Sequence, residues 1–134
     1  IVDYVHKNGP LQLGIDVHCA GELILRNPSW THQSLPAEPI LSAAGNAAAA
    51  NMNRLYKENY ESKKSASLYP TGGSMDDWFY YGAGCPGFTF EMRDKGTYMF
   101  KVPASNIIPT GEELLMGIIT LAEYFDAHPV NITN

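Results

Sequence analysis

Apolar and polar residues alternate along two short stretches of the chain. In residues 11–18 the odd positions are apolar, and the opposite row contains Asp16 and ends at His18. In residues 88–93 apolar side chains alternate with polar ones that include Glu91. A period of two is typical of a β-strand, because successive side chains point to opposite faces of a sheet. Both stretches are therefore predicted strands with one apolar and one polar face.

The spacing of apolar residues becomes helical in residues 40–60. There they recur every three or four positions on one face, beside a cluster of alanines that favours a helix and close packing. The polar residues 61–67 are predicted to end this helix. A second long helix is predicted to begin at the capping-box pattern of residues 110–113 and to stop before Pro129. With a further short strand over residues 22–25, the alternation of strands and helices predicts an α/β fold.

The composition is that of a folded domain and excludes several classes of partner. Of the 134 residues, 45% are hydrophobic and 17% are charged, which excludes a disordered chain. Nine Lys and Arg residues against 14 Asp and Glu residues give a net charge of −5, without a basic stripe. We therefore expect neither nucleic acid nor an anionic membrane as a partner. No apolar run approaches 18 residues, so no membrane-spanning helix is predicted.

His18 is the first residue with the chemistry of a functional site. It stands where a predicted strand gives way to the small residues Cys19, Ala20 and Gly21. Ligands of α/β folds bind at such strand ends, and an imidazole there can bind a metal or transfer a proton. The alternative, which its position alone favours, is a structural or exposed histidine.

Glu91 is the second candidate. It follows the run Phe88-Thr89-Phe90, and a carboxylate among aromatic rings loses hydration, which raises its pKa and suits a general base. The alternative is a glutamate on an edge strand that pairs with an Arg or a Lys.

The segment from Tyr69 to Trp78 is the third candidate. Its glycines make the backbone permissive, so that Tyr69 can move over a bound ligand. The alternative is a surface turn anchored by Trp78.

Five motifs, taken together in their order and spacing, resemble those of a known protein family. They are Asp16-Val17-His18, Leu23-Ile24-Leu25, Tyr69 ahead of Gly72-Gly73-Ser74 and Asp77-Trp78, the run from Phe88 to Asp94, and the run from Pro103 to Thr110. The chain resembles the carboxypeptidase A/B family of secreted zinc metallocarboxypeptidases. The resemblance implies a mixed, mainly parallel sheet flanked by helices, and a Zn²⁺-dependent hydrolase that removes C-terminal residues from peptides and proteins. It also implies that residues 1–134 are the C-terminal portion, roughly half, of one catalytic domain.

The resemblance assigns roles to individual residues. His18 matches the last zinc ligand, as carboxypeptidase A has a His₂Glu zinc site. Glu91 matches the general base that acts on zinc-bound water, and Tyr69 matches the mobile tyrosine that closes over the substrate. The pocket for the substrate's terminal side chain is expected to include Leu25, Leu68, Thr71, Asp76 and Thr89. The other two zinc ligands belong to a His-x-x-Glu motif that this sequence does not contain.

The sequence leaves the preferred terminal residue open. A count without gaps from Tyr69 to Trp78 puts Asp76 at the floor of the pocket, which favours C-terminal Lys or Arg. A count from the Gly-Gly-Ser run puts Met75 there, which favours apolar residues. We favour Asp76, whose charge the nearby Lys63 and Lys64 can neutralise.

The expected partners are peptide and protein C-termini and the N-terminal half of the same catalytic domain. That half is expected to supply the missing ligands and to bury an open sheet edge across a large, hydrophobic interface. The alternatives to an active, secreted enzyme are a catalytically inactive binding module and a non-functional fragment.

Two further predictions concern the backbone and the cysteines. His18 and Glu91 must reach one metal centre, so their strands are predicted to be parallel. Cys19 and Cys85 then fall at opposite strand ends, too far apart for a disulfide. The family likeness also implies cis peptide bonds at residues 19–20, 27–28 and 93–94.

Overall fold

A mixed four-stranded sheet forms the centre of the molecule. The computed structural model describes residues 1–98 and 100–132. Its strands are β1 (Gly14–Cys19), β2 (Leu23–Arg26), β3 (Glu61–Lys64) and β4 (Gly87–Met92), in the order β1-β4-β2-β3. The pairs β1–β4 and β2–β3 are parallel, and β2–β4 is antiparallel. The predicted mixed, mainly parallel sheet is confirmed.

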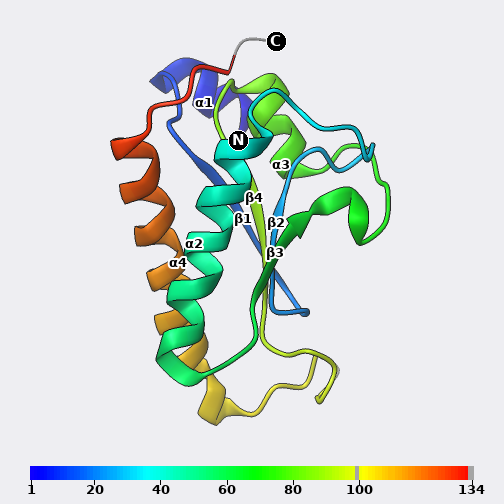
Figure 1. Cartoon of the computed structure of the whole chain (residues 1–134), viewed down its shortest axis with the longest axis vertical. Coiled ribbons are helices and arrows are strands. Elements are labelled where there is room, and N and C mark those ends of the chain that lie inside the picture. Colours follow the sequence, from blue (N-terminus) through cyan, green and yellow to red (C-terminus); the bar gives the residue numbers. More distant parts are fainter. Residues whose placement is uncertain (99, 133–134) are drawn as a thin grey trace.

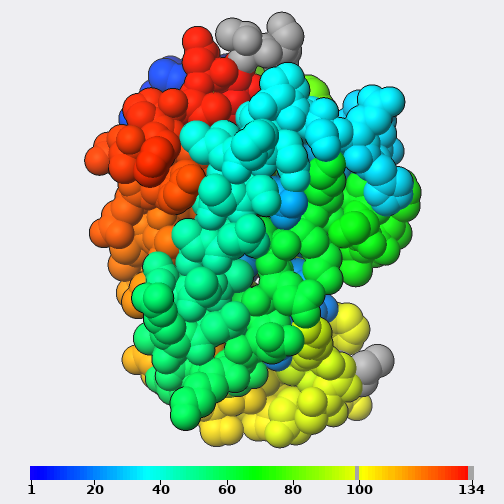
Figure 2. Space-filling model, in the orientation of Figure 1, coloured from blue at the N-terminus to red at the C-terminus, as the bar shows by residue number. Residues whose placement is uncertain are grey.

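Two long helices, α2 (Glu38–Tyr56) and α4 (Ile107–Ala127), lie side by side over one face of this sheet (Figure 1). The space-filling view shows α2 along the face seen here, with α4 on its left (Figure 2). The shorter elements are α1 (Val2–Asn8), η1 (Ser65–Ser67), α3 (Met75–Asp77), η2 (Trp78–Gly82) and η3 (Ala104–Asn106). The segment around α3 packs against the opposite face of the central strands.

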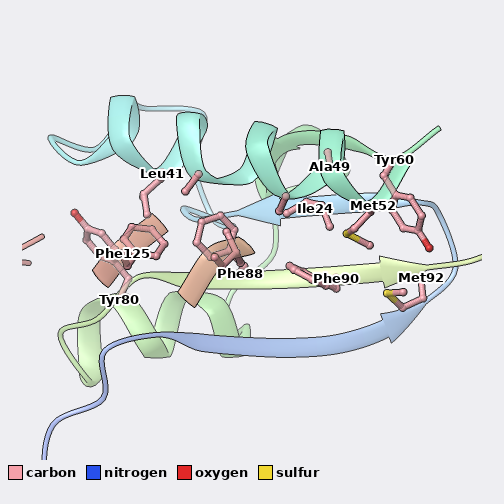
Figure 3. Packing of buried hydrophobic residues seen from close by; sticks show 13 residues of the cluster. Ile24, Leu41, Ala49, Met52, Tyr60, Tyr80, Phe88, Phe90, Met92 and Phe125 are labelled. Carbon is pink, nitrogen blue, oxygen red and sulfur yellow. The ribbon is translucent and has the colours of Figure 1, made fainter. Parts of the chain in front are cut away.

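The core lies between the sheet and the two long helices. Alternate residues of β4, among them Phe88 and Phe90, point towards α2 and are fully buried (Figure 3). Small residues allow the helices to come this close. A methyl group at Gly117 of α4 would lie 2.6 Å from Phe90 and 2.8 Å from the sulfur of Met52. The apolar face predicted for residues 88–93 is thus the face that packs on the helices.

Several element boundaries differ from the prediction. Residues 61–64, predicted only to end a helix, form the edge strand β3. Helix α2 ends earlier than expected, at Tyr56, because Lys57 adopts a left-handed conformation with φ of 60°. Helix α4 begins at Ile107, so Thr110 is inside it and does not cap it. Pro109 is compatible with this earlier start because the first turn of a helix needs no backbone N–H donor.

The predictions on cysteines and peptide bonds are confirmed. Both cysteines are free, Cys19 at the surface and Cys85 in the interior. Burial raises the pKa of the Cys85 thiol to about 11, so it is an inert packing residue. The bonds at 19–20, 27–28 and 93–94 are cis.

Candidate functional site

The polar face of the central strands gathers the candidate residues. Because side chains alternate along β4, Thr89 and Glu91 point away from the helices that cover Phe88 and Phe90. His18 of β1 is the register partner of Glu91. The parallel arrangement predicted for these two strands is confirmed, and it puts an imidazole and a carboxylate side by side on one face.

A second row lies one step further along the same face. Asp16 of β1 and Leu25 of β2 are both register partners of Thr89, one on each side. Asp16 and His18 are two residues apart on one strand, so they share a face as well. Three strands thus form a floor on which acidic, basic and apolar side chains have fixed relative positions.

A cavity of about 900 Å³ lies over this floor. It is closed on one side by the segment that contains Tyr69 and α3. Every residue that the sequence predicts for the site lines this cavity: His18, Leu25, Leu68, Tyr69, Thr71, Asp76, Thr89 and Glu91. Met75, the alternative floor residue, lines it too.

Glu91 has the surroundings of a proton acceptor. It is half-buried on β4, which has a strand on each side, so the edge-strand alternative is wrong. Burial raises the pKa of the Glu91 carboxyl, with a further increase from Asp16 and an opposing effect of His18. No Arg or Lys pairs with Glu91 among residues 1–98 and 100–132. A raised pKa makes this carboxylate a better proton acceptor.

His18 presents one ring nitrogen for a ligand. Its Nε2 lies 2.8 Å from Oδ2 of Asp16. An ionised carboxylate only accepts hydrogen bonds, so Nε2 carries a proton, and in the neutral imidazole Nδ1 then keeps its lone pair. The part of the chain that the structure describes offers Nδ1 no hydrogen-bond partner. An exposed imidazole with one nitrogen held by a carboxylate has the chemistry of a metal ligand.

The chain's own share of a metal site is limited to this imidazole. In the described ranges 1–98 and 100–132, no three His, Cys, Asp or Glu side chains converge as a metal centre would require. A catalytic zinc ion needs about three protein ligands. The described residues alone do not make up such a site, and His18 would fit it as a single ligand.

Asp76 of α3 lines the cavity and is buried, with 1% of its surface exposed. The hydroxyls of Ser29 and Ser65 are its hydrogen-bond partners, at 3.0 Å and 2.6 Å. The Ser65 hydroxyl is also 3.1 Å from the carbonyl oxygen of Arg26, and its single proton can serve only one acceptor at a time. The carboxylate is thus held in place by few donors.

No cation neutralises Asp76 among the described residues. The suggestion that Lys63 and Lys64 do so is wrong, because Lys63 pairs with Glu61 and Lys64 donates to the segment 32–34. A buried carboxylate without a cationic partner is costly unless a ligand supplies the charge.

The segment that closes the cavity is fixed at two points. The backbone N–H of Ser29 donates to both carboxylate oxygens of Asp77, and that of Thr71 donates to the carbonyl of Ser29. Burial raises the pKa of Asp77, the Ser29 N–H opposes this, and the neighbouring Asp76 adds to the increase. Tyr69 is 64% exposed at the rim, and the described residues give it no hydrogen-bond partner. A side chain held this loosely can move over a ligand.

Three polar residues of the cavity were not singled out from the sequence. Ser29 comes from a loop and Ser65 from η1, far apart in the chain, and only the fold brings them to Asp76. Asp16 carried a usable signal, because it precedes His18 by two residues on a strand and so had to share its face.

The family model described as zinc carboxypeptidase matches residues 1–117. This chain belongs to the zinc carboxypeptidase family. It is 34% identical to carboxypeptidase A1 of Bos taurus over 92% of the chain and 30% of that protein, and 36% identical to carboxypeptidase A4 of Mus musculus over 96% and 31%. A crystal structure of thrombin activatable fibrinolysis inhibitor superimposes with a TM-score of 0.87 at 28% identity, over 94% of this chain and 32% of that one.

The chain spans about a third of the length of the zinc carboxypeptidases that it matches. Its fold agrees with that of its solved relative, so its mixed sheet and flanking helices are part of the zinc carboxypeptidase fold. No helix in residues 1–98 and 100–132 is long and apolar enough to cross a membrane.

Proposed function

We propose that residues 1–134 are the C-terminal portion of the catalytic domain of a secreted, zinc-dependent exopeptidase. The enzyme hydrolyses the C-terminal peptide bond of peptides and proteins. The observation that carries this proposal is the pairing of His18 with Glu91 on neighbouring parallel strands, in a cavity that a buried carboxylate, Asp76, also lines.

Three residues of the cavity have separate roles in the proposed reaction. When bound, a zinc ion lowers the pKa of water and polarises a carbonyl group. His18 contributes one ligand through Nδ1. Glu91 takes a proton from the attacking water and gives it to the leaving amine, for which its raised pKa is suited. Tyr69 covers the terminal residue from the rim.

The remaining lining residues select that terminal residue. Leu25 and Leu68 provide apolar walls for the stem of a long side chain, with Thr71 and Thr89 beside them. Asp76 provides a negative charge that no cation among residues 1–98 and 100–132 neutralises. A C-terminal Lys or Arg matches both features, since its stem is apolar and its end is positive. Asp76 is therefore the specificity residue in this proposal, and Met75 lies beside it.

A second part of the same domain completes the site. β1 pairs with a strand on one side only within the described sheet. Large apolar residues of α4 are exposed, among them Ile108, Leu115 and Ile119. An unpaired strand edge next to an apolar helix face is what an interface inside one domain looks like when half of it is considered alone. The proposed occupant is the N-terminal half of the catalytic domain, which also supplies the other zinc ligands.

The proposal is tested by zinc content together with hydrolysis of two peptides. We expect the full-length protein to contain one zinc ion per molecule. It should release the last residue of a peptide with a free C-terminus and leave the same peptide unchanged when its C-terminus is amidated. Zinc without hydrolysis of either peptide would identify an inactive binding module. Equal cleavage of both would exclude an exopeptidase.

The terminal preference is tested by replacing Asp76 with Asn. In the full-length protein, this change should lower kcat/KM for a peptide ending in Lys about a hundredfold, because losing one partner of a buried charge pair costs about 2–5 kcal/mol. The rate on an otherwise identical peptide ending in Phe should fall little. Met75→Leu, in the same cavity, is the control and should leave the Lys-to-Phe ratio unchanged. A wild-type enzyme that strongly prefers Phe would rule out the assignment of Asp76.

A further inference from the structure

The contact between Asp16 and His18 has no part in the proposed function so far. Asp16 lies two residues before His18 on β1, and its Oδ2 is 2.8 Å from His18 Nε2. The side chains are 32% and 50% exposed, so each is free to take other conformations unless something holds it. Asp16 also faces Thr89 across the β1–β4 pair, at the bottom of the same cavity.

The chemistry of this contact decides which nitrogen of His18 is available. A neutral imidazole has two tautomers, and only the unprotonated nitrogen can bind a metal. The Asp16 carboxylate accepts a hydrogen bond and donates none. It therefore keeps the proton on Nε2 and leaves Nδ1 unprotonated. The same bond fixes the ring about its side-chain torsions. Carboxylates that hold the second nitrogen of a metal-binding histidine act in this way in other metal sites.

We propose that Asp16 is a positioning residue that fixes the tautomer and the orientation of His18 for metal binding. This inference rests on the proposed role of His18 as a zinc ligand. Asp16 does not contact substrate in it. The cation site for the substrate is Asp76, which is buried in the lining of the cavity and has no charged partner among the described residues, whereas Asp16 is already engaged with the imidazole.

The test compares variants of the full-length protein by their zinc affinity, measured by competition with a chelator. Asp16→Ala removes the acceptor, and Asp16→Leu removes it while keeping nearly the same shape. Both should weaken zinc binding by about 10- to 100-fold, the usual effect of losing such a partner. Asp16→Asn keeps an acceptor oxygen and should lie between these variants and the wild type. Asp126→Ala, an exposed aspartate at the far end of α4, is the matched control and should bind zinc normally.

A second measurement reads the tautomer without zinc or activity. In the zinc-free protein labelled with ¹⁵N-histidine, the His18 ring, assigned by comparison with His18→Gln, should show a protonated Nε2 and an unprotonated Nδ1. In Asp16→Leu both nitrogens should shift towards values for a mixture of tautomers. A role of Asp16 in folding alone would leave this pattern unchanged in the folded variant.

The outcomes separate this inference from the function on which it rests. If His18→Ala loses zinc while Asp16→Leu keeps wild-type affinity and a single tautomer, the positioning role is wrong and the zinc site stands. If His18→Ala keeps wild-type zinc affinity, the proposed ligand itself is wrong. If Asp16→Leu keeps its zinc affinity but raises KM for peptides ending in Lys and not for those ending in Phe, Asp16 binds substrate and the positioning role is overturned.

Discussion

Replacement of Glu91 by glutamine in the full-length protein should lower kcat by about 10²- to 10⁴-fold, the usual contribution of general acid–base catalysis. Glutamine has nearly the same shape as glutamate but cannot take a proton from water. KM and zinc affinity should change little, because in this proposal Glu91 holds neither the substrate nor the metal. Steady-state kinetics on a peptide with a free C-terminus measure the effect, and Glu123→Gln, an exposed glutamate of α4, is the control.

The same variant should gain stability at neutral pH while it loses activity. Burial raises the pKa of Glu91 in the folded state. The protonated form is thus favoured by folding, and its contribution to stability is present below the unfolded-state pKa and lost as pH rises through the folded-state pKa. At neutral pH the ionised side chain is a cost that glutamine does not have. Urea unfolding should therefore show Glu91→Gln to be more stable than the wild type at pH 7, with the difference vanishing in acid. In the kinetic experiment, an unchanged kcat of Glu91→Gln would exclude Glu91 as the general base.

Replacement of Glu113 by glutamine should lower the free energy of unfolding by about 3–5 kcal/mol, because it removes the buried partner of Arg93 and leaves only the ion pair with the partly exposed Glu58. Glu113 of α4 is fully buried and accepts hydrogen bonds from Arg93 Nε at 2.8 Å and from the hydroxyl of Tyr60 at 3.0 Å. Arg93 follows β4 directly, and it also pairs with Glu58 and lies over the ring of Tyr56. This network joins the end of β4 to α4.

The adjacent Glu112 is a matched control for that experiment. It is exposed and contacts the hydroxyl of Tyr56, so Glu112→Gln should cost less than about 1 kcal/mol. The double replacement Arg93→Met with Glu113→Leu removes both charges and should be less harmful than Glu113→Gln alone. Urea denaturation provides all three values. A loss below about 1 kcal/mol for Glu113→Gln would show that the ion pair with Glu58 is enough to stabilise the Arg93 charge.

The sequence predicted the structure best in the strands, where burial of one face makes apolar and polar residues alternate. Alternation along residues 11–18 and 88–93 predicted two strands and the faces on which His18 and Glu91 lie. Parallel pairing of those strands followed from the need of both residues to reach one metal ion. These features are local, or depend on a single pairing, so a sequence can specify them.

Features that depend on tertiary contacts were not predictable in this way. The edge strand β3 is polar throughout its four residues, and it forms because β2 offers it an unpaired edge. Leu55 and Tyr56 continue the apolar row of α2 but lie beyond the part covered by the sheet, and both are exposed. The hydroxyls of Ser29 and Ser65 reach Asp76 from positions 36 residues apart. No periodic pattern in the sequence predicts these contacts with Asp76.

The positions of β1 and β4 in the sheet give His18 and Glu91 different support. β4 is flanked by strands on both sides, so the backbone that carries Thr89 and Glu91 is held from two directions. β1 is the border strand of the described sheet, so the backbone that carries His18 is held from one direction only. A disturbance at the open border of β1 should therefore displace the imidazole before it displaces the carboxylate.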